Sequence, residues 1–193
     1  MSKIVFLDVD GTLIDYEAKL PASAAKAVDQ ARANGHKVYI CTGCSKAEIL
    51  QRNLCDLDGM IGGNGAYVED NGHVVMHQGL SKEDVKNIVD WCNERHIGFY
   101  LEANSGMYCN DYMLEQGPET MVKYAKGKGA SLENAKSSAQ HFIDGFIHLQ
   151  GDELYRDDVN KISFILRTYQ DHLDSKVDFP HLVANTWGGC IIW

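Results

Sequence analysis

Two aspartates separated by one residue, Asp8 and Asp10, are the part of this 193-residue sequence best suited to chemistry. They end an apolar run, "KIVFL", and residues two apart on an extended chain point to the same side. One carboxylate can attack a phosphorus atom while its partner protonates the leaving oxygen, as covalent phosphoryl transfer requires. A divalent cation with oxygen ligands is the ordinary way to bring such anionic groups together.

An Asp-x-Asp-Gly string alone is more often an acidic turn than a catalytic site. Here the string is longer, because an apolar strand leads directly into Asp-Val-Asp-Gly-Thr-Leu. Gly11 lets the backbone turn without a side chain in the path, and the Thr12 hydroxyl can fix that turn. The full string therefore favours a catalytic site over a plain turn.

The segment "YICTGCSKAEIL" supports two interpretations. Cys41 and Cys44 have the spacing of a dithiol redox site, in which a following helix lowers a thiol pKa. Thr42 and Gly43 also end an apolar strand just before a helix that begins after Ser45, where N–H groups would face an anion. A redox site would leave the two aspartates unexplained, so the phosphate-binding loop is favoured.

The elements that must position these residues alternate along the first third of the chain. Strands are predicted at "KIVFL", "HKVYIC" and "GMIGG", with helices at residues 21–35 and 45–54 between them. Pro21 suits a first helical position, and Ser45 with Glu48 has the spacing of a capping box. This alternation predicts an α/β fold with a parallel sheet, whose ligands bind beyond the carboxyl ends of the strands.

The pattern changes after Gly65. Asn71-Gly72 predicts a hairpin, a helix capped by Ser81 follows, and a second hairpin is expected near residues 105–106. A further helix is predicted at "SLENAKSSAQHF", and strands at "GFIHLQ", "KISFIL", "HLVANTW" and "CIIW", the last two joined through residues 188–189. From about residue 80 onward the chain is expected to form a separate α+β unit.

Composition limits the partners. The net charge of -9 and the pI near 5.3 argue against binding to nucleic acid or to an anionic membrane surface, since both need a cationic face. Small phosphorylated ligands remain compatible with that charge. The apolar run before Asp8 is too short for a signal peptide or a membrane span, so a cytoplasmic protein is expected. The six scattered cysteines are expected to be free, mostly buried thiols.

The string "FLDVDGTLID" resembles the first motif of the haloacid dehalogenase-like hydrolase superfamily, and Thr42-Gly43 resembles its second. The following "MIGGNGAYVEDNGHVV" resembles Cof-type sugar-phosphate phosphatases, in which a cap domain is inserted after such a hairpin. The resemblance implies a Rossmann-like parallel-sheet core at residues 1–80, present in part, and an inserted α+β cap at residues 81–193.

The resemblance also implies roles for single residues. Asp8 would be the nucleophile and a Mg²⁺ ligand. Asp10 would be the general acid and base, with its backbone carbonyl on the metal. The Thr42 hydroxyl and the Gly43 N–H would hold the phosphoryl oxygens, and Asp10 and Gly11 complete the expected phosphate-binding set.

The sequence departs from the family in two ways. Many relatives carry arginine where this chain has Cys44, which removes one anchoring contact. Relatives also have a motif lysine and an acidic Gly-Asp motif after the cap, whereas this sequence ends at "GGCIIW". The segment "GDELYRDD" and Lys161 mimic those motifs but lie in the cap region. A solvated acidic loop is expected for the former and a structural or surface role for the latter.

The expected function is therefore a Mg²⁺-dependent phosphatase of small phosphorylated metabolites, acting through an aspartyl-phosphate at Asp8. A non-catalytic family member that binds a ligand or partner is the alternative, and a phosphomutase or phosphotransferase is a third, weaker option. In the complete fold the strand at residues 4–7 would be central and covered by helices on both faces. Here one edge is expected to be bare, and a homodimer could form through it.

Overall fold

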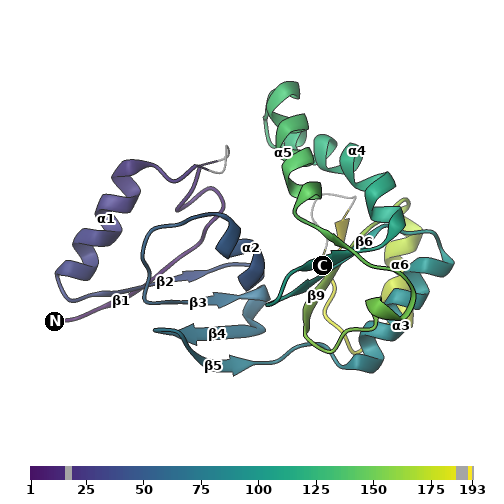
Figure 1. Ribbon diagram of the computed structural model, residues 1–193, viewed down its shortest axis with the longest axis horizontal. Coiled ribbons are helices and arrows are strands. Elements are labelled where there is room, and N and C mark those ends of the chain that lie inside the picture. The colour runs from purple at the N-terminus through teal and green to yellow at the C-terminus, as the bar shows by residue number, and fades with distance from the viewer. Residues whose placement is uncertain (16–18, 186–190, 193) are drawn as a thin grey trace. The chain divides into compact units, whose positions relative to one another are not determined.

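The computed structural model describes residues 1–15, 19–185 and 191–192, and the chain divides into two compact units (Figure 1). The first unit contains Met1–Gly79 with Ala103–Ser105, and the second contains Leu80–Glu102 with Gly106–Trp193. Each unit is built on its own five-stranded sheet.

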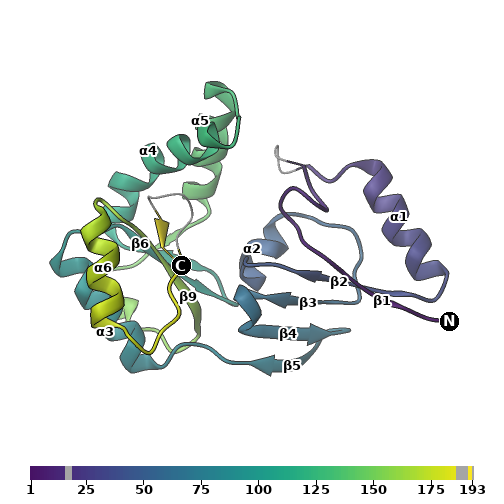
Figure 2. The same cartoon turned by 180° about the vertical axis from the view of Figure 1, so that it is seen from behind.

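The sheet of the first unit has the order β1-β2-β3-β4-β5 (Figure 2). Its strands are β1 Ile4–Leu7, β2 Lys37–Cys41, β3 Gly59–Gly62, β4 Tyr67–Asp70 and β5 His73–His77. The first three strands are parallel, and the last two add an antiparallel hairpin at the far edge. The predicted strand–helix alternation is confirmed, and it places the carboxyl ends of β1 and β2 side by side.

Two helices and a short turn complete this unit. They are α1 Ala22–Ala33, α2 Lys46–Gln51 and the 3-10 turn η1 Gly63–Gly65. Pro21 is the extended N-cap of α1 and not its first helical residue. Ser45 caps α2 by accepting the Glu48 N–H at 3.3 Å, while the Glu48 carboxylate bonds Arg52. Only the Ser45 half of the predicted capping box is therefore formed in the bonds described.

β1 lies at the edge of the sheet. Within the described part of the chain it pairs with β2 alone, in agreement with the bare edge expected from the sequence. Val5 and Leu7 pack against the core on the α1 side, but Ile4 and Phe6 are 61% and 55% exposed. The expectation that helices cover both faces of this strand is not met by the described residues.

The second unit is an α+β fold, as predicted, with the strand order β10-β9-β6-β7-β8. Its strands are β6 Phe99–Ala103, β7 Met107–Cys109, β8 Ile147–His148, β9 Val159–Ile165 and β10 Ile191–Ile192. Its helices are α3 Lys82–Glu94, α4 Asp111–Gly127, α5 Leu132–Asp144 and α6 Tyr169–Asp178, with a 3-10 turn, η2, at Gly151–Leu154. The β6–β7 pair is the predicted antiparallel hairpin.

The sequence pattern does not predict helix α4. Gly117 and Pro118 lie inside this 17-residue helix, although both residue types usually end helices. The helix is supported by its N-cap, because the Asn110 side chain accepts the Met113 N–H at 3.0 Å. Gly117 allows close packing on α5, since a Cβ there would lie 2.8 Å from the Ile143 side chain. Tertiary packing therefore outweighs the local helix-breaking signal.

The sequence prediction was wrong for one of the strands expected near the end of the chain. Residues 181–185 of the predicted strand "HLVANTW" form no strand, and its last two residues lie outside the described part. The strand predicted at "CIIW" is present in the described residues 191–192 as β10, which pairs antiparallel with β9. Helix α6 was not predicted, because it buries Asp171, His172 and Ser175 and leaves no hydrophobic stripe in the sequence.

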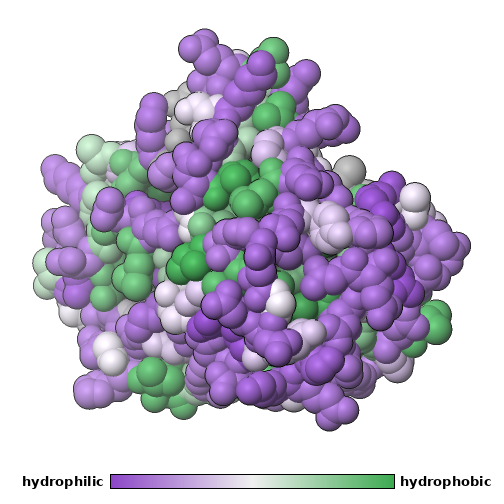
Figure 3. Space-filling model, turned by 45° about the vertical axis from the view of Figure 1, so that its right-hand side comes forward, coloured by the Kyte–Doolittle hydropathy of each residue, from purple (hydrophilic) through white to green (hydrophobic). Residues whose placement is uncertain are grey.

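The surface drawn in Figure 3 is mostly hydrophilic, with separate hydrophobic groups between the polar side chains. Among the residues described, no helix is both long and apolar enough to cross a membrane.

Candidate functional site

The two aspartates occupy a tight turn that leaves β1. The carbonyl of Val9 accepts the N–H groups of the residues at 12, 13 and 14, at 3.0–3.3 Å, and the carbonyl of Asp8 also accepts the Leu13 N–H. Val9, Leu13 and Ile14 are buried, so they anchor the turn in the core. Asp8 and Asp10 are both exposed on either side of buried Val9.

Gly11 makes the turn possible. Its φ of 76° lies in the left-handed region that glycine adopts at low cost, and its N–H bonds the carbonyl of Ile14 at 2.9 Å. The predicted role of this glycine in turning the backbone is therefore seen in the structure. The sequence was right about where the chain turns and which side chains the turn presents.

The loop after β2 carries Thr42 and Gly43. Thr42 is 7% exposed, its N–H bonds the carbonyl of Ile61 at 2.9 Å, and its hydroxyl accepts the Cys44 N–H at 3.2 Å. A Cβ at Gly43 would lie 2.9 Å from the Asn64 amide oxygen, so a larger residue would force that side chain to move. The loop is thus a compact, hydrogen-bonded turn with little room for side chains.

Asp10 joins this loop to the aspartate turn. One Asp10 carboxylate oxygen accepts a hydrogen bond from Arg52 Nη1 at 2.5 Å, and the other lies 3.6 Å from the thiol of Cys44. Arg52 Nη2 also donates to Glu48 at 2.7 Å and lies 3.6 Å from Cys44 Sγ. The structure therefore brings together the two sequence segments that were expected to share a site.

Arg52 was missed by the sequence analysis. The available signal was the i,i+4 spacing of Glu48 and Arg52, which is common on helices and does not point to Asp10. Burial works to lower the pKa of Arg52, but the neighbouring Cys44, Glu48 and Asp10 outweigh it, and the net pKa is raised. Arg52 is accordingly a permanent cation in the site.

Cys44 does not have the electrostatics of a reactive redox thiol. Burial, followed by the charge of Glu48, raises the pKa of the Cys44 thiol well above its ordinary value. A reactive dithiol needs the opposite, a stabilised thiolate. The five described cysteines are free, as expected, but Cys41 is exposed, Cys44 and Cys55 are half-buried, and Cys92 and Cys109 alone are buried.

The donor set suits a hard cation with a partly open coordination sphere. The Asp8 carboxylate is exposed, and no hydrogen bond among the described residues engages the carbonyl of Asp10. Mg²⁺ in phosphate sites takes one or two carboxylates plus water and substrate oxygens, so these two oxygens fit it. Within the described residues, however, no group of three His, Cys, Asp or Glu side chains could hold a metal by itself.

The two stretches that resemble the family's later motifs, residues 151–158 and Lys161, both make hydrogen bonds or ion pairs within the second unit. In the acidic segment, Arg156 pairs with Asp158 at 2.7 Å and the Tyr155 hydroxyl donates to Asp90 at 2.6 Å. Asp152, Glu153 and Asp157 are exposed, as expected of a solvated acidic segment, although residues 151–154 form a 3-10 turn and not an irregular loop. Lys161 is buried against Glu102 at 3.0 Å, in accordance with a structural role.

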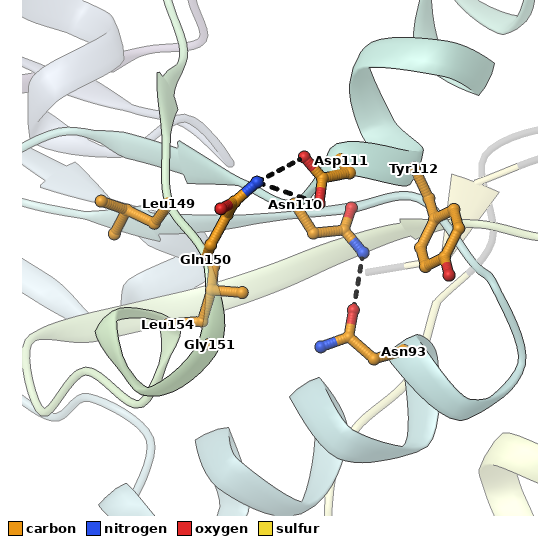
Figure 4. A pocket seen from close by; sticks show the side chains of 8 residues that line it. All are labelled: Asn93, Asn110, Asp111, Tyr112, Leu149, Gln150, Gly151 and Leu154. Carbon is orange, nitrogen blue, oxygen red and sulfur yellow. Dashed lines mark hydrogen bonds between the residues drawn. The ribbon is translucent and has the colours of Figure 1, made fainter.

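The second unit contains a polar cavity of about 200 Å³ between the end of α3, the start of α4 and the segment before η2 (Figure 4). Its wall is a hydrogen-bonded network. Gln150 donates to both Asp111 oxygens at 3.1 and 3.3 Å, and Asn110 donates to Asn93 at 3.0 Å. The Asn110 amide also bonds three backbone groups, so this side chain holds the fold together.

Comparison with known proteins decides the family. A model of the haloacid dehalogenase-like hydrolase family matches residues 5–191. The chain belongs to this family. A haloacid dehalogenase-like hydrolase from B. subtilis superposes with a TM-score of 0.75 at 18% identity, over 98% of this chain and 72% of that one. The subclass IIB sugar phosphatase BT4131 gives 0.68 at 21% identity, over 100% and 68%. The α/β core with a cap predicted from the sequence is thereby confirmed.

Sequence relatives are named phosphatases. The 5-amino-6-(5-phospho-D-ribitylamino)uracil phosphatase YwtE of Bacillus subtilis (strain 168) is 31% identical over 114 residues, which is 58% of this haloacid dehalogenase-like chain and 37% of that protein. The matched region spans between 37% and 43% of the length of the curated relatives. The chain thus matches less than half of these proteins.

Proposed function

We propose that this chain carries the nucleophile-bearing part of a Mg²⁺-dependent phosphatase that hydrolyses small phosphorylated metabolites, such as sugar phosphates. The proposal rests above all on Asp10, whose carboxylate contacts Arg52 and the Cys44 thiol and so joins the aspartate turn to the Thr42-Gly43 loop. The names of the relatives, all phosphatases, support the same reaction class.

The proposed reaction has two steps. An Asp8 oxygen attacks phosphorus, the bond from phosphorus to the leaving oxygen breaks, and Asp10 gives that oxygen its proton. A water molecule then attacks phosphorus of the aspartyl-phosphate, Asp10 takes the proton, and inorganic phosphate leaves with Asp8 restored. The Thr42 hydroxyl, the Gly43 N–H and the turn at Gly11 hold the phosphoryl oxygens.

Asp8 and the carbonyl of Asp10 are the groups that would hold Mg²⁺. When bound, the cation offsets the repulsion between the anionic nucleophile and the phosphoryl group. In this assignment the first unit is the catalytic core and the second is the cap, with the boundary near residue 80. The cap would then be the part that selects the metabolite.

A specific observation keeps a second candidate open. Among the described residues, no group of three His, Cys, Asp or Glu side chains could hold a metal ion. A non-catalytic protein that binds a phosphorylated ligand or a partner would need the phosphate loop but not a complete metal site. Ligand binding without turnover separates this candidate from the phosphatase.

Hydrolysis of p-nitrophenyl phosphate with and without Mg²⁺ tests the proposal. We expect Mg²⁺-dependent turnover that Asp8→Asn abolishes, because an amide cannot form the acyl phosphate. Asp29→Asn is the matched control, since Asp29 is an exposed aspartate on α1. Equal, Mg²⁺-independent rates for the unaltered chain and Asp8→Asn would rule out the phosphatase.

A further inference from the structure

Arg52 makes two ion pairs, one with a neighbour on its own helix and one with a residue far away in the sequence. Its bond to Glu48, four residues earlier on the same helix, is an ordinary pair that needs no function. Its bond to Asp10 crosses 42 residues of sequence and ends on the carboxylate that the proposed reaction uses for proton transfer. The second contact is the one that calls for an explanation.

The guanidinium is held in place by its surroundings. The side chain of Arg52 is 21% exposed and that of Glu48 is 14% exposed, while the Asp10 side chain is 54% exposed. Arginine donors lie in one rigid plane, so bonding Nη2 to Glu48 fixes the direction in which Nη1 points. Glu48 therefore aims Arg52, and Arg52 in turn holds the more exposed Asp10 carboxylate.

We infer that Arg52 is a positioning residue for Asp10: it occupies one carboxylate oxygen, Oδ1, and leaves Oδ2 as the oxygen that gives and takes the proton. The Cys44 thiol approaches Oδ2 at 3.6 Å and is only a weak donor. The inference rests on the proposed function. In the first step the proton leaves Oδ2 for the leaving-group oxygen as the bond from phosphorus breaks. In the second step a proton of the attacking water returns to Oδ2. In the structure Oδ1 is bonded to Arg52 Nη1, and in the proposed mechanism that bond is kept in both steps.

Removing the guanidinium frees the Asp10 carboxylate to rotate. Arg52→Ala should lower kcat for p-nitrophenyl phosphate by about 10- to 100-fold, the usual effect of a misplaced catalytic group, with KM changed less than about twofold. Arg52→Lys should recover part of the rate, since an ammonium keeps the charge but not the planar fork. Arg32→Ala is the matched control, because Arg32 pairs with Asp58 at 3.3 Å on another side of the same unit and should leave kcat unchanged.

A purely structural role predicts other results. If Arg52 acts through Asp10, Arg52→Ala should add less than about a twofold loss to Asp10→Asn, since changes that share one partner are not additive. Full additivity would overturn the inference, as would an unchanged kcat for Arg52→Ala.

A second measurement works without turnover. The side-chain carboxyl ¹³C resonance of Asp10, assigned through Asp10→Asn, should shift in Arg52→Ala and stay in place in Arg32→Ala. An unmoved resonance in Arg52→Ala overturns the inference whether or not the protein is active. An absence of turnover in the unaltered chain, with the resonance shifted, contradicts the proposed function and leaves the positioning contact established.

Discussion

The buried pair between Lys161 and Glu102 offers a quantitative prediction. The Glu102 side chain is 0% exposed and that of Lys161 is 9% exposed, with Nζ 3.0 Å from Oε2, and Ser163 donates to the other Glu102 oxygen at 2.8 Å. Lys161→Met keeps the apolar stem but leaves a buried carboxylate without its ion-pair partner. Breaking a buried pair in this way costs about 3–5 kcal/mol.

Urea denaturation measures that cost. With a slope of about 2 kcal/mol per molar urea, the urea concentration at the unfolding midpoint of the second unit should fall by about 1.5–2.5 M. Glu102→Gln combined with Lys161→Met should recover most of the loss, because no buried charge remains. Lys136→Met, at an exposed lysine on α5, should stay within about 0.5 kcal/mol. A midpoint for Lys161→Met equal to that of this control would refute the structural role of the pair.

Three further results are expected. Hydrogen bonds, first from Lys46, hold the pKa of Glu69 below its ordinary value of 4.5, so this carboxylate stabilises the fold above that pH and the effect is lost on acidification. The unfolding midpoint of Glu69→Gln should therefore fall less between pH 5 and 3 than the midpoint of the unaltered chain. An equal fall of the two midpoints over this pH range would contradict the prediction. Light scattering should show that the chain self-associates through the bare edge of β1. Val5→Lys should disrupt folding as well as association, because Val5 packs toward α1. A stable, monodisperse monomer would argue against self-association. Insulin reduction should be absent, since burial raises the pKa of the Cys44 thiol; a reductase activity lost in Cys41→Ser and Cys44→Ser would restore the redox interpretation.

The first unit was predictable from the sequence because its signals are local. Four apolar residues before Asp8, a glycine where the turn needs a positive φ and a serine cap before α2 each specify one structure over a few residues. The β-α-β order then follows from the handedness and length limits of parallel connections. Because β1 and β2 are parallel neighbours, the aspartate turn after β1 and the Thr42 loop after β2 lie close together.

The parts that were missed depend on contacts between distant residues. Arg52 reaches Asp10 only when folding brings the end of α2 to the turn after β1, and nothing in the sequence near Arg52 indicates this contact. Helix α4 contains Gly117 because α5 packs against that position, which local propensity cannot reveal. In α6 the buried side chains are polar, so the hydrophobic period that identifies most helices is missing.

The most direct test of the account is the site of covalent phosphorylation. The protein would be mixed with p-nitrophenyl phosphate and Mg²⁺, quenched in acid and digested, and its peptides analysed by mass spectrometry. The account predicts one hydroxylamine-sensitive phosphoryl group on Asp8, enriched in Asp10→Asn, where the second step is slowed, and absent from Asp8→Asn. Mg²⁺-dependent turnover with no acyl phosphate, or with the phosphoryl group on another residue, would contradict it.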